Sequence, residues 1–137
     1  MMNRMISRVL VCAAVGFAAQ FASAAPYSWT GLGGDALWSN VNNWSPVGLP
    51  GAADDVTIPA GATAVSISTA NVTVQSLDLQ RGLSLAANRT LTVTSASLTG
   101  VISLTSGSTL SGTYTIGAGG NITFPARCNF GRLNNVT

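Results

Sequence analysis

The stretch "TLTVTSASLTGVISLTSGS", residues 90–108, carries most of the information about the fold. Its leucine, valine and isoleucine residues alternate with threonine and serine, and it contains no charged residue, aromatic residue or proline. Alternation with a period of two is typical of β-strands that bury one face. A helix is disfavoured, because threonine, serine, valine and glycine have low helix propensity and no apolar stripe recurs every 3.6 residues.

The same pattern precedes and follows this stretch, so that residues 71–89, 90–108 and 109–127 align as three consecutive lines of 19 residues. A fixed period near twenty indicates stacked repeats, and three short strands joined by tight turns in each repeat describe one coil of a parallel β-helix. An antiparallel sandwich is the alternative, but it does not require like residues in columns. The predicted apolar columns are Val72/Leu91/Leu110, Val74/Val93 followed by Gly112, Leu79/Leu98, Val65/Leu83/Ile102 and Ile67/Leu85/Leu104, with Ile116 one residue early and Ile122 and Phe124 one residue late.

Residues 1–24 are predicted to be a cleaved signal peptide. Arg4 and Arg8 precede a short apolar run, residues 9–21, and small residues follow at 22–24. Thirteen helical residues span only ~20 Å, which is shorter than a ~30 Å hydrocarbon core, so a membrane anchor is the weaker interpretation. We expect cleavage before Ala25 or Pro26, a secreted or cell-surface location, and no membrane span after cleavage.

Residues 25–54 differ from the repeats and are predicted to cap the open end of the first coil, which begins at residue 55 with Val56 and Ile58. This segment contains all three tryptophans of the chain. Its pattern is Trp29, Gly31, Gly33-Gly34, Trp38-Ser39, Asn43-Trp44, Pro50-Gly51 and Asp54-Asp55-Val56. The pattern resembles the opening of secreted bacterial right-handed parallel β-helix surface proteins, the autotransporter-passenger-like and haemagglutinin-like proteins. The resemblance implies a non-enzymatic surface or adhesin-like role, although such proteins usually have many more coils.

Residues 55–137 provide about four coils, and no aromatic or polar lid is recognisable after Phe130. We therefore expect the coil array to be incomplete at its C-terminus and the chain to self-associate through that edge. Cys128 is the one cysteine outside the leader. A buried, unreactive thiol is favoured there over an intermolecular disulfide.

The charged residues argue against most enzymatic and nucleic-acid-binding functions. The chain has no histidine, lysine or glutamate, so the usual general bases and amine nucleophiles are missing. Outside the leader, four arginines balance four aspartates, which leaves no basic surface for nucleic acid. The paired carboxylates Asp54 and Asp55 are predicted to serve a turn, with a calcium site as the weaker alternative. We expect no catalytic residue, cofactor or metal.

Two binding hypotheses remain from the sequence. Tyr27, Trp29, Trp38 and Trp44 are candidate carbohydrate contacts, against the alternative that they pack within the cap. Outward threonine columns could form an ice-binding array, although threonine suits any exposed strand. These columns are Asn71/Thr90/Thr109, Thr73/Thr92/Ser111 and Gln75/Thr94/Thr113.

The sequence thus predicts a secreted all-β protein that serves as an extracellular or cell-surface structural module, possible partners being surface polysaccharide and further copies of the chain. The alternative is a fragment of a carbohydrate-binding or polysaccharide-lyase-like β-helix protein.

Overall fold

A computed structural model describes residues 24–124 of the 137-residue chain. Ala24, the last residue of the expected signal peptide, lies at the start of this range. The rest of that peptide and Cys128 lie outside the described residues, so their predicted roles stay predictions.

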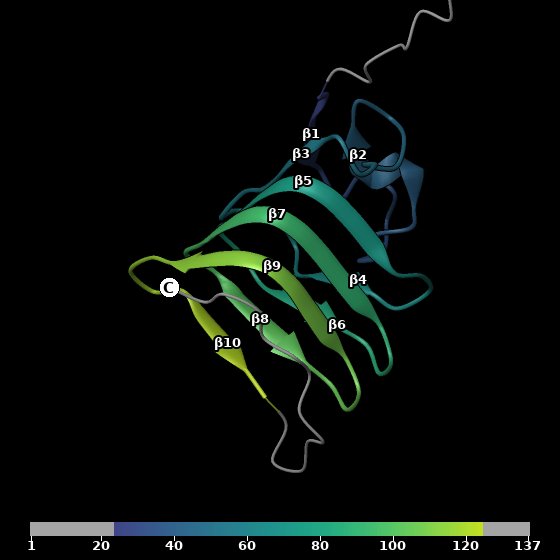
Figure 1. Cartoon of the computed structure of the whole chain (residues 1–137). Coiled ribbons are helices and arrows are strands. Elements are labelled where there is room, and N and C mark those ends of the chain that lie inside the picture. The colour runs from purple at the N-terminus through teal and green to yellow at the C-terminus, as the bar shows by residue number, and fades with distance from the viewer. Residues whose placement is uncertain (1–23, 125–137) are drawn as a thin grey trace, which may run out of the picture.

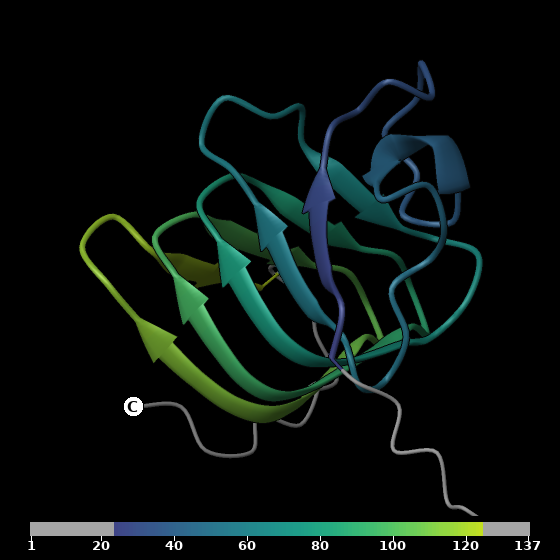
Figure 2. The ribbon, with the colours of Figure 1, turned by 90° about the horizontal axis from the view of Figure 1, so that it is seen from above.

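The fold is a parallel β-solenoid of about four turns (Figure 1). Successive coils stack so that equivalent strands lie side by side in two sheets, and the view from above shows the strands of the larger sheet curving around a common interior (Figure 2). In sheet order, the six-stranded sheet contains β2 (Trp44–Ser45), β1 (Pro26–Trp29), β3 (Asp55–Ile58), β5 (Val72–Leu79), β7 (Thr90–Leu98) and β9 (Thr109–Ile116). The four-stranded sheet contains β10 (Asn121–Thr123), β8 (Val101–Leu104), β6 (Leu83–Leu85) and β4 (Val65–Ile67).

The predicted columns are confirmed by the strand register. Strands β3, β5, β7 and β9 pair in parallel, as do β4, β6, β8 and β10. The columns Val72/Leu91/Leu110, Val74/Val93, Leu79/Leu98/Ile116, Val65/Leu83/Ile102/Ile122 and Ile67/Leu85/Leu104 are all in register. Most of these side chains belong to one continuous buried core, so each coil covers the apolar face of the next.

Each coil contains two strands rather than the three that the sequence predicted. The first two apolar bursts, Val72/Val74 and Leu77/Leu79, belong to the single strand β5, whose inward alternation changes phase at Gln75 and Ser76. Two successive outward residues let the strand bend from one side of the coil to the next without interrupting its pairing with β7.

The irregular spacing around Ile116 comes from a bulge at Gly112. The register of β7 and β9 shifts between Thr92 and Ser95, so Gly112 replaces two residues of the preceding coil. Gly112 has φ +123°, and a Cβ atom there would collide with the carbonyl oxygen of Val93. A side chain is therefore excluded at this position, and the coil is one residue shorter.

Core volume is balanced between neighbouring coils. Leu77, Ala96 and Tyr114 form one inward column, in which the small Ala96 lies between two larger residues. The Tyr114 hydroxyl lies 3.3 Å from the carbonyl oxygen of Leu91, to which it donates a hydrogen bond. Burial raises the pKa of the Tyr114 phenol far above its usual value, so the ring acts as a neutral core residue.

The predicted cap also extends both sheets. Strand β1 pairs in parallel with β3, and β2 pairs antiparallel with β1 at the edge of the larger sheet. An isolated parallel bridge joins Leu37 to Ser66, the middle residue of β4. In the chain, the 3-10 helix η1 (Val41–Asn43) lies between the bridge residue Leu37 and strand β2. At the other end of the described chain β9 and β10 are the last strands, and self-association through that edge stays a prediction.

Candidate functional site

Four aromatic side chains of the predicted cap form one cluster centred on Trp44. The indoles of Trp29 and Trp38 meet it edge-on, with ring centroids 4.9 Å and 4.7 Å away. Tyr27 makes a similar T-shaped contact at 6.4 Å. Such edge-to-face pairs contribute about 0.5–1.5 kcal/mol each beyond the burial of their surface. β1 supplies Tyr27 and Trp29, and β2 supplies Trp44, so pairing of these strands assembles the cluster.

The cluster is a packed core rather than an exposed platform. Trp29, Trp38 and Trp44 expose only 2–4% of their surface, and the Trp44 indole N–H donates to the Trp38 carbonyl oxygen at 2.9 Å. A sugar ring stacks on an open aromatic face, which Trp29 and Trp44 do not offer. These indoles cover the end of the solenoid core, which is the cap packing predicted from the sequence as the alternative. Carbohydrate contact by the four aromatics stays a prediction. Tyr27 is partly exposed.

A hydrogen-bond network around Asn43 fixes the loop that precedes η1. The Asn43 side chain is fully buried. Its Oδ1 accepts from the Gly33 N–H at 2.8 Å, and its Nδ2 donates to Asp35 Oδ1 at 2.8 Å and to the Leu37 carbonyl at 3.0 Å. A Cβ atom on Gly33 would collide with Asn43, so only glycine allows this close approach. One asparagine therefore ties three points of the loop to the aromatic cluster.

Asp35 is the charged member of this network. Its carboxylate accepts hydrogen bonds from the Leu37 N–H and from the side-chain amides of Asn40 and Asn43. These donors stabilise the ionised form and lower the pKa of Asp35, the Leu37 amide contributing most. All three donors belong to the same loop and to η1, so the Asp35 carboxylate stabilises the conformation of this segment.

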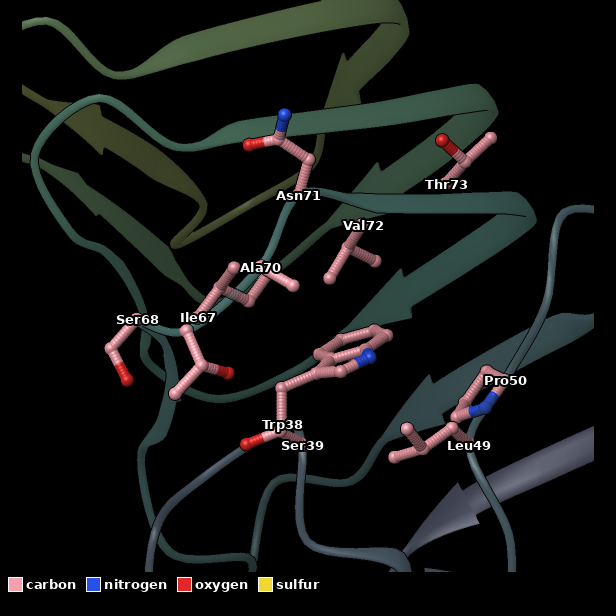
Figure 3. Close-up of a pocket in the computed structure, with 11 residues that line it drawn as sticks. Trp38, Ser39, Leu49, Pro50, Ile67, Ser68, Ala70, Asn71, Val72 and Thr73 are labelled. Atoms are coloured by element: carbon pink, nitrogen blue, oxygen red, sulfur yellow. The ribbon is translucent and has the colours of Figure 1, made fainter.

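Beside the cluster lies a small groove of about 130 Å³ between the cap and the corner that joins β4 to β5. Figure 3 shows the Trp38 indole in this groove, with Val72 on one side and Leu49 and Pro50 on the other. Among the candidate tryptophans, Trp38 is the one that lines this groove. The groove is lined by Trp38, Ser39, Leu49, Pro50 and Ile67–Thr73.

Leu49 and the corner residues were not singled out in the sequence as site residues. Leu49 is 47% exposed although it is apolar, and Val47 beside it is 71% exposed. The signal available was "PVGLPG", in which apolar residues stand among turn formers and outside any strand period. Their exposure, however, depends on how the cap folds over β4 and β5, which the local sequence does not encode.

The outer faces of the coils carry hydroxyl groups in register. Ser66, Ser84 and Ser103 form one column on the smaller sheet, and Thr123 continues it. The last two hydroxyls of the column contact each other, with Thr123 Oγ1 3.2 Å from Ser103 Oγ. Charged side chains are sparse on these strands, so the exterior is polar and nearly neutral.

The predicted flat threonine array is only partly present. Thr73, Thr92 and Ser111 are in register. The predicted column Gln75/Thr94/Thr113 is wrong, because the Gly112 bulge places Thr113 opposite Ser95 rather than Thr94. The bulge therefore breaks the regular lattice of hydroxyls that ice binding would require.

Asp54 and Asp55 have separate structural roles, and only Asp54 serves the turn that the sequence predicted for both. Asp54 Oδ2 accepts the Gly51 N–H at 2.7 Å and closes a turn, whereas Asp55 begins β3 and accepts a hydrogen bond from the Ser76 hydroxyl. Residues 24–124 contain no group of three or more potential metal-binding side chains. Within the same range, no helix is long and apolar enough to cross a membrane.

Comparison with known proteins extends over most of the chain. Residues 28–129 match a family described as a domain of unknown function, DUF8693. The match starts within β1, passes through the aromatic cluster and covers the coils. No curated protein and no solved structure matches the chain. Because the match covers well over half of the sequence and joins the cluster to the solenoid, the protein belongs to the DUF8693 family.

Proposed function

We propose that this protein is an exported, non-enzymatic β-solenoid module that acts at or outside the cell surface through its outer faces, in the manner of an adhesin. The observation that carries the proposal is the in-register column of hydroxyls on the outside of the smaller sheet. Strand spacing sets these groups about 4.8 Å apart along the solenoid axis. A rigid, nearly neutral row of hydroxyls suits contact with another repetitive polar surface, such as a polysaccharide.

The backbone holds this surface rigidly. Ser84 Oγ donates to the Val65 carbonyl of the preceding coil at 3.3 Å, and Thr123 Oγ1 donates to the Ile102 carbonyl at 3.3 Å. The stacked strands therefore fix the positions of the hydroxyl groups in this column. A preorganised surface loses little conformational entropy on contact, which favours weak binding repeated over many coils.

The leader supports the extracellular part of the proposal. Arg4 and Arg8 followed by an apolar run and small residues form the pattern of an export signal. The test is to fuse residues 1–30 to a reporter enzyme that is active only outside the cytoplasm. We expect activity from the native leader and its loss when Leu10 and Val15 are both replaced by arginine. Equal activity from the two fusions would contradict export.

The surface role is tested with the chain that starts at Ala25. We expect it to bind insoluble polysaccharides weakly in pull-down assays, more strongly when displayed in many copies on beads. The double variant Ser84→Asp/Ser103→Asp places charges in the hydroxyl column and should abolish binding, whereas Ser106→Asp, an exposed residue outside both that column and the Trp38 groove, should not. If all three proteins bind equally, or none binds to any polysaccharide offered, the adhesin-like role is wrong.

The Trp38 groove favours a second candidate, in which the protein holds a single sugar ring or chain end. An indole beside Ser39, Asn71 and Thr73 combines an apolar ring surface with polar groups, which is the chemistry that carbohydrate sites use. Titration with monosaccharides and oligosaccharides should shift the NMR signal of the Trp38 indole N–H and leave the Trp29 signal in place. Leu49→Arg, which blocks the groove, should remove the shift. A spectrum unchanged at saturating sugar would eliminate this site.

A further inference from the structure

The backbone of Ala25 is fixed on both sides before β1 begins. Its N–H lies 3.0 Å from Asp54 Oδ1, and its carbonyl oxygen accepts from the Asp55 N–H at 3.0 Å. Strand β1 starts at the next residue, Pro26, which has no N–H to donate. Ala25 is therefore the residue whose backbone donor joins the start of β1 to the segment that leads into β3.

The carboxylate of Asp54 connects two structures. Oδ2 accepts the Gly51 N–H at 2.7 Å, while the Asp54 N–H donates to the Gly51 carbonyl at 3.1 Å, so this side chain closes the turn Gly51–Asp54. Oδ1 is left for the nitrogen of Ala25. In the uncleaved chain this nitrogen is a neutral amide, so the Asp54 carboxylate accepts only neutral donors, Ala25 at Oδ1 and Gly51 at Oδ2.

We propose that the mature protein begins at Ala25 and that its new α-ammonium group forms an ion pair with Asp54. This proposal rests on the proposed export. Water hydrolyses the bond between Ala24 and Ala25 under a signal peptidase: its oxygen bonds to the Ala24 carbonyl carbon, the C–N bond breaks, and the amine takes up a proton. The products are an Ala24 carboxylate and an Ala25 amine, which is protonated below a pKa of about 8.

The geometry distinguishes the two cleavage sites that the sequence left open. Cleavage before Pro26 would remove Ala25, and with it both backbone contacts to Asp54 and Asp55. Cleavage before Ala25 preserves both contacts and replaces a neutral donor with a cation, which strengthens the hydrogen bond to a carboxylate. Processing at that bond would therefore complete the cap.

The pH dependence follows from the charge. Asp54 raises the pKa of the Ala25 amine above its unfolded value, so the stabilisation is fully present below pH ~8 and is lost as pH rises through the folded value. Asp54 and Asp55 are the titratable groups on the segment bonded to Ala25, and Tyr27 is the one on β1. Asp55 is engaged with Ser76, which leaves Asp54 as the direct partner.

The experiment compares three forms of the mature chain: unmodified Ala25–Thr137, the same chain acetylated at Ala25, and Asp54→Asn. Acetylation keeps an N–H donor and the carboxylate but removes the positive charge, so it isolates the ion pair, whereas Asp54→Asn also alters the turn at Gly51. Between pH 7 and pH 10, the unmodified chain should lose about 2–5 °C of Tm relative to the acetylated chain. NMR titration should give an Ala25 amine pKa about 0.5–1 unit higher than in Asp54→Asn. Identical Tm profiles or identical pKa values would overturn the ion pair.

The cleavage site is read directly from the N-terminal mass of the exported protein. A chain starting at Ala25 is expected, and export with a start at Pro26 or elsewhere would overturn this inference while leaving the proposed function intact. Absence of export would instead reject the proposed extracellular function, together with processing, while the ion pair would still be judged by the pH experiment on the purified chain.

Discussion

The coils and the cap reach the same degree of burial by different means. In the coils, aliphatic columns such as Leu79/Leu98/Ile116 repeat the same contact from one layer to the next. In the cap, Trp44 and Asn43 each make contacts that occur nowhere else in residues 24–124. Repetition spreads stability over many similar residues, whereas the cap depends on a few. A single substitution should therefore lower the unfolding free energy moderately in the coils and strongly at the centre of the cap.

The largest effect is expected from the centre of the cap. Trp44→Ala removes the ring that contacts three other aromatics and should cost about 3–5 kcal/mol of unfolding free energy. Urea unfolding followed by fluorescence and by far-UV circular dichroism measures it. Trp44→Phe retains an aromatic ring but loses the bond to the Trp38 carbonyl, so it should cost less. Equal losses for the two variants would show that ring packing is not the main contribution.

The matching substitution in the coils is Leu98→Ala. Leu98 is fully buried between Leu79 and Ile116, and its truncation should cost about 2–4 kcal/mol. All tryptophans lie in the cap, so their fluorescence reports the cap while circular dichroism is dominated by the coils. We expect Leu98→Ala to lower the circular dichroism midpoint at least as much as the fluorescence midpoint. The reverse order would mean that the coils depend on the cap more than on their own columns.

A smaller effect is expected from the polar centre of the cap. Asn43→Ala leaves the partly buried Gly33 N–H without its partner and should cost about 1–3 kcal/mol. The neighbouring Asn42 is exposed and provides the control, since Asn42→Ala should change stability by less than about 0.5 kcal/mol. Thermal unfolding of both variants compares them. Similar Tm values would show that the network does not stabilise the cap.

At the coil corners, Asn88 and Gly107 occupy equivalent left-handed positions, with φ of 59° and 74°. Gly107→Ala should cost about 1–2 kcal/mol, because a Cβ atom there is strained and would collide with the Asn88 side chain. Gly61→Ala is the control, since open space surrounds that glycine. Chemical denaturation of the two variants tests whether the corner requires a special backbone conformation.

The sequence predicted the coils far better than the cap, and the reason is physical. An inward column requires apolar residues at a constant spacing. The positions of Leu91, Leu98 and Ile102 relative to the preceding repeat therefore predict the coil from the sequence alone. The bend at Gln75 was missed because two successive outward residues look like a break between strands. The register around Gly112 depends on the close approach of its backbone to the Val93 carbonyl, which arises only when the two strands are stacked.

In the cap, the sequence identified the aromatic residues but not their arrangement. Trp29, Trp38 and Trp44 do not follow a strand or helix period, so nothing local indicated whether their faces would be open or buried. Pairing of β1 with both β2 and β3 decides this. The Trp38 groove likewise forms between segments separated by about thirty residues, and Asn43 shows its role only once its three loop partners surround it.

The smallest effect concerns the acid response of the cap. Hydrogen bonds from Leu37, Asn40 and Asn43 lower the pKa of Asp35 below its ordinary value of 3.8. A depressed folded pKa contributes stability that is present above the unfolded value and lost as pH falls through the folded one, so the cap should weaken below pH ~4. Tryptophan fluorescence should then change at a higher pH than the circular dichroism of the coils. Asp35→Asn has no such titration, and its fluorescence should lose that early step. If wild type and Asp35→Asn follow the same curve down to pH 2, the carboxylate does not hold the loop, and Asn43 alone must connect it to the aromatic cluster.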